Sequence, residues 1–320
     1  MDRQLSLEFA RITEQAALKS ARLVGLGDKE GADQAAVDGM HEQFALTPVS
    51  GTVVIGEGEI DEAPMLYIGE HVGQGGEEVD IAVDPVEGTN LVAKGKNGAI
   101  AVLAIAPKGC LLHAPDMYMQ KICVGPRAKG RIDIRASVTE NLKNVADAMG
   151  REVSDLTMVI LDRERHEKII REAREAGARV YLITDGDVVP SVDCGIQGSG
   201  IHMVMGSGGA PEGVLSAVGL KCLGGDMQAR LLPQTEQEIQ RLHTMGIDPN
   251  KVLTLDDLVK GDDCIFAETA ITDCAMLRGV RFFGGGARTS TLVLRYKTGT
   301  VRFIDTVHRF GEDKPGVRMF

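Results

Sequence analysis

Residues 79 to 89 read Val79-Asp80-Ile81-Ala82-Val83-Asp84-Pro85-Val86-Glu87-Gly88-Thr89. An apolar run typical of a buried strand ends on the carboxylate of Asp84, and a proline then stops the strand. Asp84 and Glu87 therefore stand on a rigid turn at a strand tip, and carboxylate oxygens are ligands that Mg²⁺ and Mn²⁺ prefer. Gly88 and Thr89 add backbone N–H groups and a hydroxyl, which suit a phosphate. The stretch predicts a divalent-cation site beside a phosphate site.

Composition indicates an ordinary globular protein. The chain has 320 residues, of which 43% are hydrophobic and 25% charged, so its length exceeds one typical core and favours two domains. Aromatic residues make up only 4% and Trp is absent, which argues against stacking on single-stranded nucleic acid. The net charge of −11 argues against nucleic acid or an anionic membrane as a partner. Bound divalent cations would let such an acidic protein attract a phosphorylated substrate.

Cysteine usage and the N-terminus predict a cytoplasmic protein. The sequence has no CxxC motif, no regular cysteine framework and no run of 18 apolar residues, and it begins with a polar amphipathic segment. We therefore expect free thiols in a reducing compartment. The six cysteines are Cys110, Cys123, Cys194, Cys222, Cys264 and Cys274.

Hydrophobic periodicity predicts the elements of the first half. A helical stripe covers residues 5–23, and a second helix follows Gly31. Strands are expected at 51–55, 66–70, 79–84 and 99–106, and a helix at 139–149 that Gly150 closes. We place a domain boundary there: residues 1–150 would bind metal and phosphate, and residues 151–320 would bind the substrate.

After residue 150 the predicted elements alternate. Strands at 157–161 and 179–184 flank a helix at 166–176, and a short strand near Met203 precedes a helix at 211–223. Such alternation implies a parallel or mixed sheet with helices on its faces, hence a mixed α/β (α+β) fold. Residues 291–295 and 300–304 form a predicted hairpin.

Four short segments place an acid beside glycine. Each alone is typical of a turn, but all four fall at predicted strand tips or helix starts. Together they predict one carboxylate cage, in which two or three cations about 3.5–4 Å apart would clamp a phosphate and activate a water. The segments are Gly31-Ala32-Asp33, Gly56-Glu57-Gly58-Glu59, Asp84 to Thr89, and Gly208-Gly209-Ala210-Pro211-Glu212-Gly213.

Other motifs leave alternatives open. Arg163 and Arg165, in Asp162-Arg163-Glu164-Arg165-His166, could hold a second phosphate, although the residues alone favour a solvated surface run. Asp185-Gly186-Asp187 could accept hydrogen bonds from sugar hydroxyls, or could be a plain turn. The G-x-G spacing near Gly206 is a weak dinucleotide match, because Pro211 interrupts it. The sequence has no P-loop, GxSxG or HExxH motif.

These segments resemble the class II fructose-1,6-bisphosphatases of bacteria, and the D-P-x-[DE]-G-T turn resembles the wider lithium-sensitive phosphatases. The resemblance runs through nearly the whole chain, and the string from Glu57 to Glu70 is its most specific part. It implies a layered α-β-α-β-α sandwich of the sugar phosphatase type, in two domains.

The resemblance also implies roles for individual residues. Thr89 would help to orient and deprotonate the attacking water, and Asp61 would support the cage or act as a base. Glu164 stands where the family usually has proline. Mn²⁺ or Mg²⁺ would be held by Asp33, Glu57, Asp84, Glu87 and Glu212. The substrate would contact Glu87, Gly88, Thr89, Tyr118, Arg163, Glu164, Arg165, Asp185, Gly186, Asp187 and Gly209.

The implied activity is metal-dependent hydrolysis of fructose 1,6-bisphosphate in gluconeogenesis, by a homodimer or homotetramer. A sugar bisphosphate would be the partner, with no nucleic acid and no membrane. Two alternatives stay open: a sedoheptulose-1,7-bisphosphatase or inositol phosphatase of the same superfamily, and a non-catalytic sugar-phosphate sensor. The two arginines favour a bisphosphate over a monophosphate, and the complete set of acids with Thr89 argues against the sensor.

Overall fold

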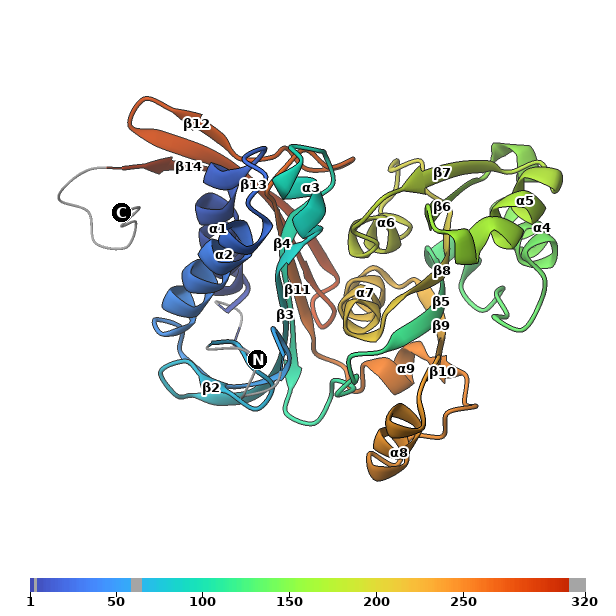
Figure 1. Cartoon of the computed structure of the whole chain (residues 1–320), viewed down its shortest axis with the longest axis horizontal. Coiled ribbons are helices and arrows are strands. Elements are labelled where there is room, and N and C mark those ends of the chain that lie inside the picture. Colours follow the sequence, from blue (N-terminus) through green and yellow to red (C-terminus); the bar gives the residue numbers. More distant parts are fainter. Residues whose placement is uncertain (3–4, 59–64, 311–320) are drawn as a thin grey trace. The chain divides into compact units, whose positions relative to one another are not determined.

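The computed structural model describes residues 1–2, 5–58 and 65–310. The chain forms two compact units, each built on its own sheet (Figure 1). The first unit comprises Met1–Lys108 and Ile265–Phe320, and the second comprises Gly109–Cys264. The predicted division at residue 150 differs from these units, because Gly150 only ends a helix inside the second one. The second unit is an insertion in the first.

The first unit contains a sheet of eight described strands in the order β12-β13-β11-β4-β3-β1-β2, with β14 paired to β13. β1 and β3 are parallel, and the other neighbours are antiparallel. The strands are β1 (Val49–Ile55), β2 (His71–Val72), β3 (Glu77–Glu87), β4 (Ile100–Pro107), β11 (Ile265–Ala270), β12 (Arg281–Phe283), β13 (Gly286–Arg295) and β14 (Thr300–Arg309).

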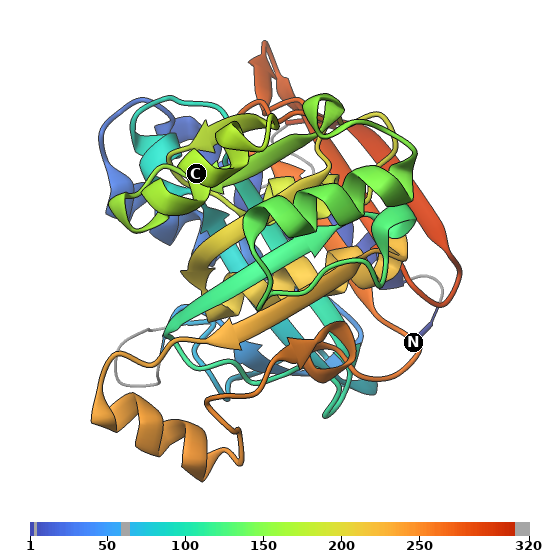
Figure 2. The same ribbon diagram turned by 90° about the vertical axis from the view of Figure 1, so that its right-hand side faces the viewer.

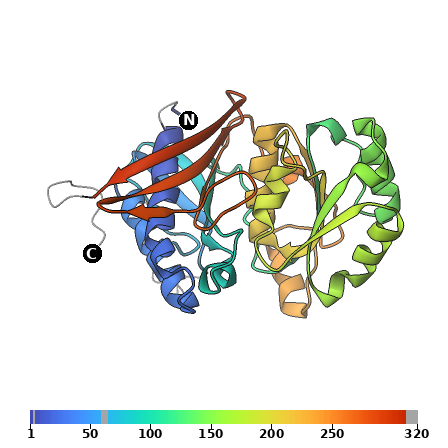
Figure 3. The same cartoon turned by 90° about the horizontal axis from the view of Figure 1, so that it is seen from above.

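Helices α1 (Leu5–Ser20) and α2 (Lys29–Phe44) cover one face of this sheet (Figure 1). The predicted stripe of α1 is confirmed, because Phe9, Ile12 and Ala16 are fully buried. β13 and β14 run beside α1 (Figure 3). A short 3-10 helix, η1 (Ala21–Leu23), follows α1, and α3 (Thr89–Ala93) follows β3.

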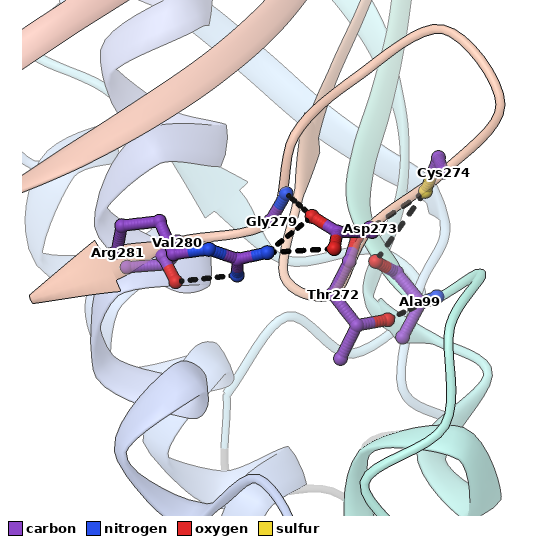
Figure 4. A network of polar contacts seen from close by, with 7 residues as sticks. All are labelled: Ala99, Thr272, Asp273, Cys274, Gly279, Val280 and Arg281. Atoms are coloured by element: carbon purple, nitrogen blue, oxygen red, sulfur yellow. Dashed lines mark hydrogen bonds and ion pairs between the residues drawn. The ribbon is translucent and has the colours of Figure 1, made fainter.

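The loop between β11 and β12 is fixed by polar contacts (Figure 4). Both carboxylate oxygens of Asp273 accept hydrogen bonds of 2.6 Å from Arg281 Nη2, and the N–H of Gly279 donates to Oδ1. These contacts lower the pKa of Asp273, the Gly279 N–H most of all. Thr272 Oγ1 accepts from the N–H of Ala99 at 3.0 Å. The loop is therefore tied to the start of β4.

The second unit contains a sheet of six described strands in the order β10-β9-β5-β8-β6-β7. β6 is parallel to β7 and β8, whereas β5 is antiparallel to β8 and β9, so the sheet is mixed, as the sequence predicts. The strands are β5 (Tyr118–Val124), β6 (Thr157–Leu161), β7 (Arg179–Ile183), β8 (Met203–Gly209), β9 (Asp226–Leu231) and β10 (Leu253–Thr254).

Helices cover both faces of the second sheet. α4 (Val138–Met149) and α5 (Glu167–Glu175) lie on one face, and α6 (Val188–Asp193) and α7 (Ala210–Leu223) lie on the other (Figure 1). Figure 2 shows α4, in green, across its face. α8 (Glu236–Thr244), in orange, extends away from the sheet, and α9 (Leu255–Leu258) follows β10. Short 3-10 helices are η2 (Pro126–Ala128), η3 (Val153–Asp155) and η4 (Glu164–His166).

The two units confirm the predicted mixed α/β class with two domains, while element bounds differ in places. Residues 66–70 form turns rather than a strand, because Gly69 adopts a positive φ of 95°. β8 extends beyond its predicted end to Gly209, and the C-terminal hairpin is longer at both ends. The predicted strand 157–161 matches β6.

The six cysteines lie in the described part of the chain, and none of them forms a disulfide there. None of the described helices is both long enough and apolar enough to cross a bilayer.

Candidate active site

Asp33 and Glu57 form a coupled carboxyl pair in the first unit. Asp33 lies in the second turn of α2, whose N-cap is Asp28, and Glu57 lies two residues beyond β1. The two side chains share a hydrogen bond. Burial raises the pKa of Glu57 to about 8, with a further increase from the charge of Asp33. Burial also raises the pKa of Asp33, although the bond to Glu57 and the charge of Lys29 oppose this.

Asp84 and Glu87 lie together at the end of β3. The pairing register with β4 shifts between them, so Pro85 and Val86 of β3 correspond to the single residue Ala101 of β4 and form a bulge. The N–H of Val86 donates to Asp84 Oδ1 at 3.0 Å, which closes the turn. One carboxylate oxygen of Asp84 and one of Glu87 lie within 4.8 Å of each other. The bulge therefore aims two acids at one place.

Gly88 joins β3 to helix α3. Its φ of 92° lies in the region that favours glycine, and a Cβ there would come within 2.9 Å of Leu91 Cδ1. The carbonyl of Gly88 accepts from the N–H groups of Leu91 and Val92, and Thr89 opens the helix half-buried. The turn thus places Thr89 two residues after Glu87, at the start of α3.

The two pairs of acids, Asp33 with Glu57 and Asp84 with Glu87, follow the carboxyl ends of the neighbouring strands β1 and β3. β1 and β3 are parallel, with Ile55 opposite Ala82, so Glu57 and Asp84 each lie two residues beyond that pair. Adjacent strands are about 4.8 Å apart. The raised pKa values of Asp33 and Glu57 show that burial disfavours their negative charge, and a divalent cation is the group that would relieve it. The donor set, all carboxylate oxygen, fits Mg²⁺ or Mn²⁺.

Arg163 and Arg165 follow β6 in the second unit, and both are held through their N–H groups. Arg163 Nη2 donates to the carbonyl of Thr184 at 2.7 Å. Arg165 donates from Nε to Ser207 Oγ at 3.0 Å and from Nη2 to the Ser207 carbonyl at 2.8 Å. Hydrogen bonds therefore orient both arginines, although Glu164 and Arg165 are exposed, as in the surface run that the sequence alone favoured.

Tyr118 extends this arginine segment. It is the first residue of β5, opposite Gly209 of β8, and it is 47% exposed. The Arg165 guanidinium lies over its ring, 5.0 Å from the centroid. Such a cation–π contact orients the guanidinium without neutralising it. The structure thus brings Tyr118, Arg165 and the end of β8 together.

Asp187 pairs with a lysine that the sequence analysis did not single out. Lys121, in the middle of β5, is 1% exposed, and its Nζ lies 2.7 Å from Asp187 Oδ1. Desolvation of Lys121 opposes its charge, but the carboxylates of Asp187 and Glu212 outweigh that effect and raise its pKa. Asp187 is 7% exposed, whereas Asp185 is half-buried and Gly186 turns the chain at a φ of 76°.

Glu212 lies in the first turn of α7, directly after β8. Its Oε2 is buried and has no hydrogen-bond partner among the described residues. Burial raises the pKa of Glu212, and the charge of Lys121 partly offsets this. A Cβ on Gly209 would lie 1.9 Å from that same oxygen, so only glycine leaves room for it. An orphaned carboxylate oxygen of this kind fits a cation ligand.

Sequence reasoning missed Lys121, His166 and Ser207. His166 is 2% exposed, donates from Nδ1 to the Leu161 carbonyl and accepts at Nε2 from the N–H of Ser207. This fixes Ser207, and with it Arg165. One signal in the sequence could have revealed Lys121: this lysine stands directly before the apolar residues Ile122 and Cys123. The predicted residue Asp61 lies outside the described residues.

The chain is similar to known proteins over nearly its whole length. The family model for bacterial fructose-1,6-bisphosphatase, glpX-encoded, matches residues 3–308. A protein of Synechococcus sp. (strain JA-2-3B'a(2-13)), named D-fructose 1,6-bisphosphatase class 2/sedoheptulose 1,7-bisphosphatase, is 50% identical over an alignment 346 positions long that covers 100% of both chains. A protein of the same name from Trichodesmium erythraeum (strain IMS101) is 47% identical and covers 98% of this chain and 99% of its own.

The match covers nearly the whole chain, including the Asp84–Thr89 turn and the Arg163–Arg165 segment. Proteins with this family model are phosphoric monoester hydrolases, consistent with an acid-lined edge beside a Gly-Thr turn. The chain belongs to the family of bacterial, glpX-encoded fructose-1,6-bisphosphatases.

Proposed function

We propose that this protein hydrolyses fructose 1,6-bisphosphate to fructose 6-phosphate and phosphate. The observation that supports the proposal is the pair of acid clusters at the carboxyl ends of β1 and β3, Asp33 with Glu57 and Asp84 with Glu87, the latter followed by Gly88-Thr89. Family membership and the names of the relatives support the same reaction.

The four acids would hold Mn²⁺ or Mg²⁺, and the family resemblance adds Glu212 of the second unit to them. A bound divalent cation supplies charge neutralisation for the phosphate and acidity for a water. The Thr89 hydroxyl, which follows the Gly88 turn, would accept a hydrogen bond from that water and so direct a lone pair of the water oxygen toward phosphorus. Asp61 would assist as a base or as a support of the acids.

The second phosphate would bind to Arg163 and Arg165, because guanidinium groups match phosphate oxygens in charge and geometry. Carbonyl, hydroxyl and aromatic contacts already orient both side chains, so little freedom is lost when a phosphate binds. Asp185 and Gly186 would meet the sugar hydroxyls, with Gly209 and Tyr118 beside them. Asp187 would also contact the sugar hydroxyls while it stays paired with Lys121.

The relatives' shared name gives a second candidate substrate, sedoheptulose 1,7-bisphosphate. It carries the same two phosphates on a longer carbon chain, so the proposed arginine contacts would serve both. The names of the relatives are the observation that favours this second activity, and the test below separates the two substrates.

The decisive experiment measures inorganic phosphate released by the full-length protein with Mn²⁺, with Mg²⁺ and after EDTA. Fructose 1,6-bisphosphate, sedoheptulose 1,7-bisphosphate and inositol 1-phosphate are compared at equal concentration. We expect metal-dependent release from the fructose ester and loss of all release with EDTA. Release only from inositol 1-phosphate would overturn the bisphosphate assignment, and silence on all three with metal bound would indicate a sensor.

The arginine contacts have their own test. Arg165→Ala should raise the KM for fructose 1,6-bisphosphate at least about tenfold, because a charge-assisted hydrogen-bond donor is lost, while kcat changes much less. The matched control is Arg174→Ala, an exposed arginine of α5 in the same unit. If Arg165→Ala kept the parental KM, Arg165 would not hold the second phosphate.

The proposal places this reaction in gluconeogenesis, in the cytoplasm, and in a homodimer or homotetramer. Light scattering coupled to size-exclusion chromatography measures the assembly directly.

A further inference from the structure

The second unit contains a cavity of about 520 Å³ that is separate from the residues described above. Arg127, Arg151, Arg179 and His202 line it. The cavity lies where β6 and β7 begin, since Arg179 opens β7 and His202 contacts Thr157, the first residue of β6. The Arg163–Arg165 segment follows the other end of β6. A strand rises about 3.3 Å per residue, so the five residues of β6 separate the two places.

The three arginines keep their charge available. Within the described part of the chain, the acceptors of their N–H groups are uncharged. Arg127 Nη2 donates to the Met149 carbonyl at 2.6 Å, and Arg179 Nη2 donates to the Asp155 carbonyl at 2.6 Å. Arg179 Nε also donates to Thr157 Oγ1 at 3.3 Å. These contacts orient the guanidinium groups, and their uncharged acceptors do not neutralise them.

His202 has donors on both sides and lacks an acceptor. The backbone N–H of Thr157 donates to Nδ1 at 2.9 Å, and Arg151 Nη1 lies 3.0 Å from Nε2. Burial, and then the charges of Arg151 and Arg179, lower the pKa of His202 against the smaller opposing effect of Asp155, so its ring is neutral and carries one proton at neutral pH. Because Nδ1 accepts from Thr157, we assign that proton to Nε2, where it faces the N–H of Arg151.

This contact between two donors is relieved by an oxygen that accepts from both. His202 is 9% exposed, so water reaches its ring poorly and the missing acceptor is costly. Three guanidinium groups and an imidazole N–H line this cavity. A carboxylate, with two oxygens and one negative charge, would match only part of this set of donors. A phosphate group supplies more acceptor oxygens and up to two charges. The volume also exceeds that of a phosphate alone, and Met149 and Ile196 line part of it.

We propose that this cavity binds the phosphate group of a small phosphorylated molecule, with one phosphate oxygen accepting from both His202 Nε2 and Arg151. The ligand is either inorganic phosphate or a phosphate monoester, whose carbon skeleton would contact Met149 and Ile196. The proposal does not depend on the reaction at the candidate active site.

The test is a titration of the full-length, Mg²⁺-loaded protein, followed by the ring ¹⁵N and ¹H resonances of His202. The resonances are identified by their loss in His202→Gln. Inorganic phosphate, ribose 5-phosphate and sodium chloride at matched ionic strength are the three ligands. Because the signal belongs to His202, phosphate that binds at the candidate active site does not report in it.

We expect a saturable shift of the His202 resonances with a phosphate ligand and none with chloride. Arg151→Gln and Arg179→Gln should weaken the affinity at least about tenfold, and Arg174→Gln should leave it unchanged. Tighter binding of ribose 5-phosphate would identify a monoester as the ligand, and tighter binding of inorganic phosphate would identify the free anion. Both outcomes support a phosphate site.

Three results would overturn the proposal: no shift with either phosphate ligand, an equal shift with chloride, or an unchanged affinity in Arg151→Gln and Arg179→Gln. Circular dichroism checks that each variant is folded. If Arg151→Gln or Arg179→Gln does not fold, Arg127→Gln is measured in its place.

Discussion

The acids of the candidate site are held in an unfavourable state until a cation joins them. Glu57 is the extreme case, because burial and the neighbouring Asp33 raise its pKa to about 8. Two carboxyl groups that share a hydrogen bond in a partly dehydrated place cannot both ionise easily. A divalent cation changes the sign of the local field, so the same burial then strengthens binding.

Glu57→Gln should therefore lower phosphate release from fructose 1,6-bisphosphate by about 100-fold or more, because it removes a carboxylate ligand while keeping the side-chain volume. The measurement is kcat/KM with saturating Mn²⁺, together with the number of Mn²⁺ ions bound at equilibrium. Glu78→Gln is the control, since Glu78 is an exposed acid of the same unit that pairs with Lys108. Full activity in Glu57→Gln would remove Glu57 from the ligand set.

Asp193 is a second buried acid, at the end of α6. It is 1% exposed, its two carboxylate oxygens have no hydrogen-bond partner among the described residues, and burial raises its pKa to about 7. The unfolded chain ionises this group near 3.8, so the folded state binds the proton more tightly. Stability is then unaffected below about pH 4, falls between about pH 4 and pH 7, and stays lowered above that range.

Asp193→Asn should remove this fall in the free energy of unfolding between pH 4 and pH 7. The free energy of unfolding of the variant should rise relative to the parent as the pH increases from 4 to 7, by an amount on the order of 3–4 kcal/mol at most, and then stay constant. Urea unfolding at pH 4.5, 6 and 8 measures the difference. A difference that does not change with pH would show that Asp193 ionises normally in the folded protein.

At the scale of elements, the turn from β3 to α3 sets the geometry of the site. Gly88→Ala adds a Cβ at a φ of 92°, which costs roughly 1–2 kcal/mol, and places it 2.9 Å from Leu91 Cδ1. We expect the turn to shift and kcat to fall, since Thr89 moves with it. Gly75→Ala is matched, with a φ of 90° and nothing within 4 Å of its Cβ. The Gly75→Ala variant should be less stable in urea but should keep the parental kcat. An equal kcat in Gly88→Ala and Gly75→Ala would contradict this role of the turn.

The pairing of β5 with α6 through Lys121 and Asp187 gives the next prediction. Lys121→Met leaves Asp187 buried without its cation and should lower the free energy of unfolding by about 3–5 kcal/mol. The double variant Lys121→Met/Asp187→Asn should recover part of the loss, because the Asp187 carboxylate is then no longer left buried without its cation. Lys108→Met, which breaks the exposed pair with Glu78, should leave stability nearly unchanged. Urea unfolding compares all four proteins; no recovery in the double variant would contradict a pairing role.

The same elements explain how far the sequence could be interpreted. Strands with continuous apolar runs, such as β6, and helices with clear ends, such as α4 before Gly150, were predictable. β5 was not, because its Gln and Lys interrupt the apolar pattern, and Lys121 is buried only through its partner Asp187. The acids beside glycine were visible as motifs. The donor contact at His202 was not, since it needs three segments of the fold.

At the scale of the whole molecule, the second unit is an insertion whose two ends lie side by side. The N–H of Lys260 donates to the Cys110 carbonyl at 2.7 Å, and the N–H of Leu112 donates to the Leu258 carbonyl at 2.9 Å. The chain therefore leaves the first sheet after β4 and returns as β11, which pairs directly with β4. A change of pattern near residue 150 could not reveal this, because the closing partners are more than 140 residues apart in the sequence.

This topology predicts which fragments fold. A fragment of residues 109–264 contains every strand of the second sheet, the hydrophobic core between that sheet and helices α4 and α5, and both tied ends, so it should melt cooperatively on its own. A fragment of residues 151–320 lacks β5, which lies between β8 and β9 in the middle of that sheet, and should not. Circular dichroism melting and amide hydrogen exchange of the two fragments compare them directly. Cooperative melting of 151–320, with 109–264 unfolded, would restore the boundary at residue 150 and would contradict the insertion.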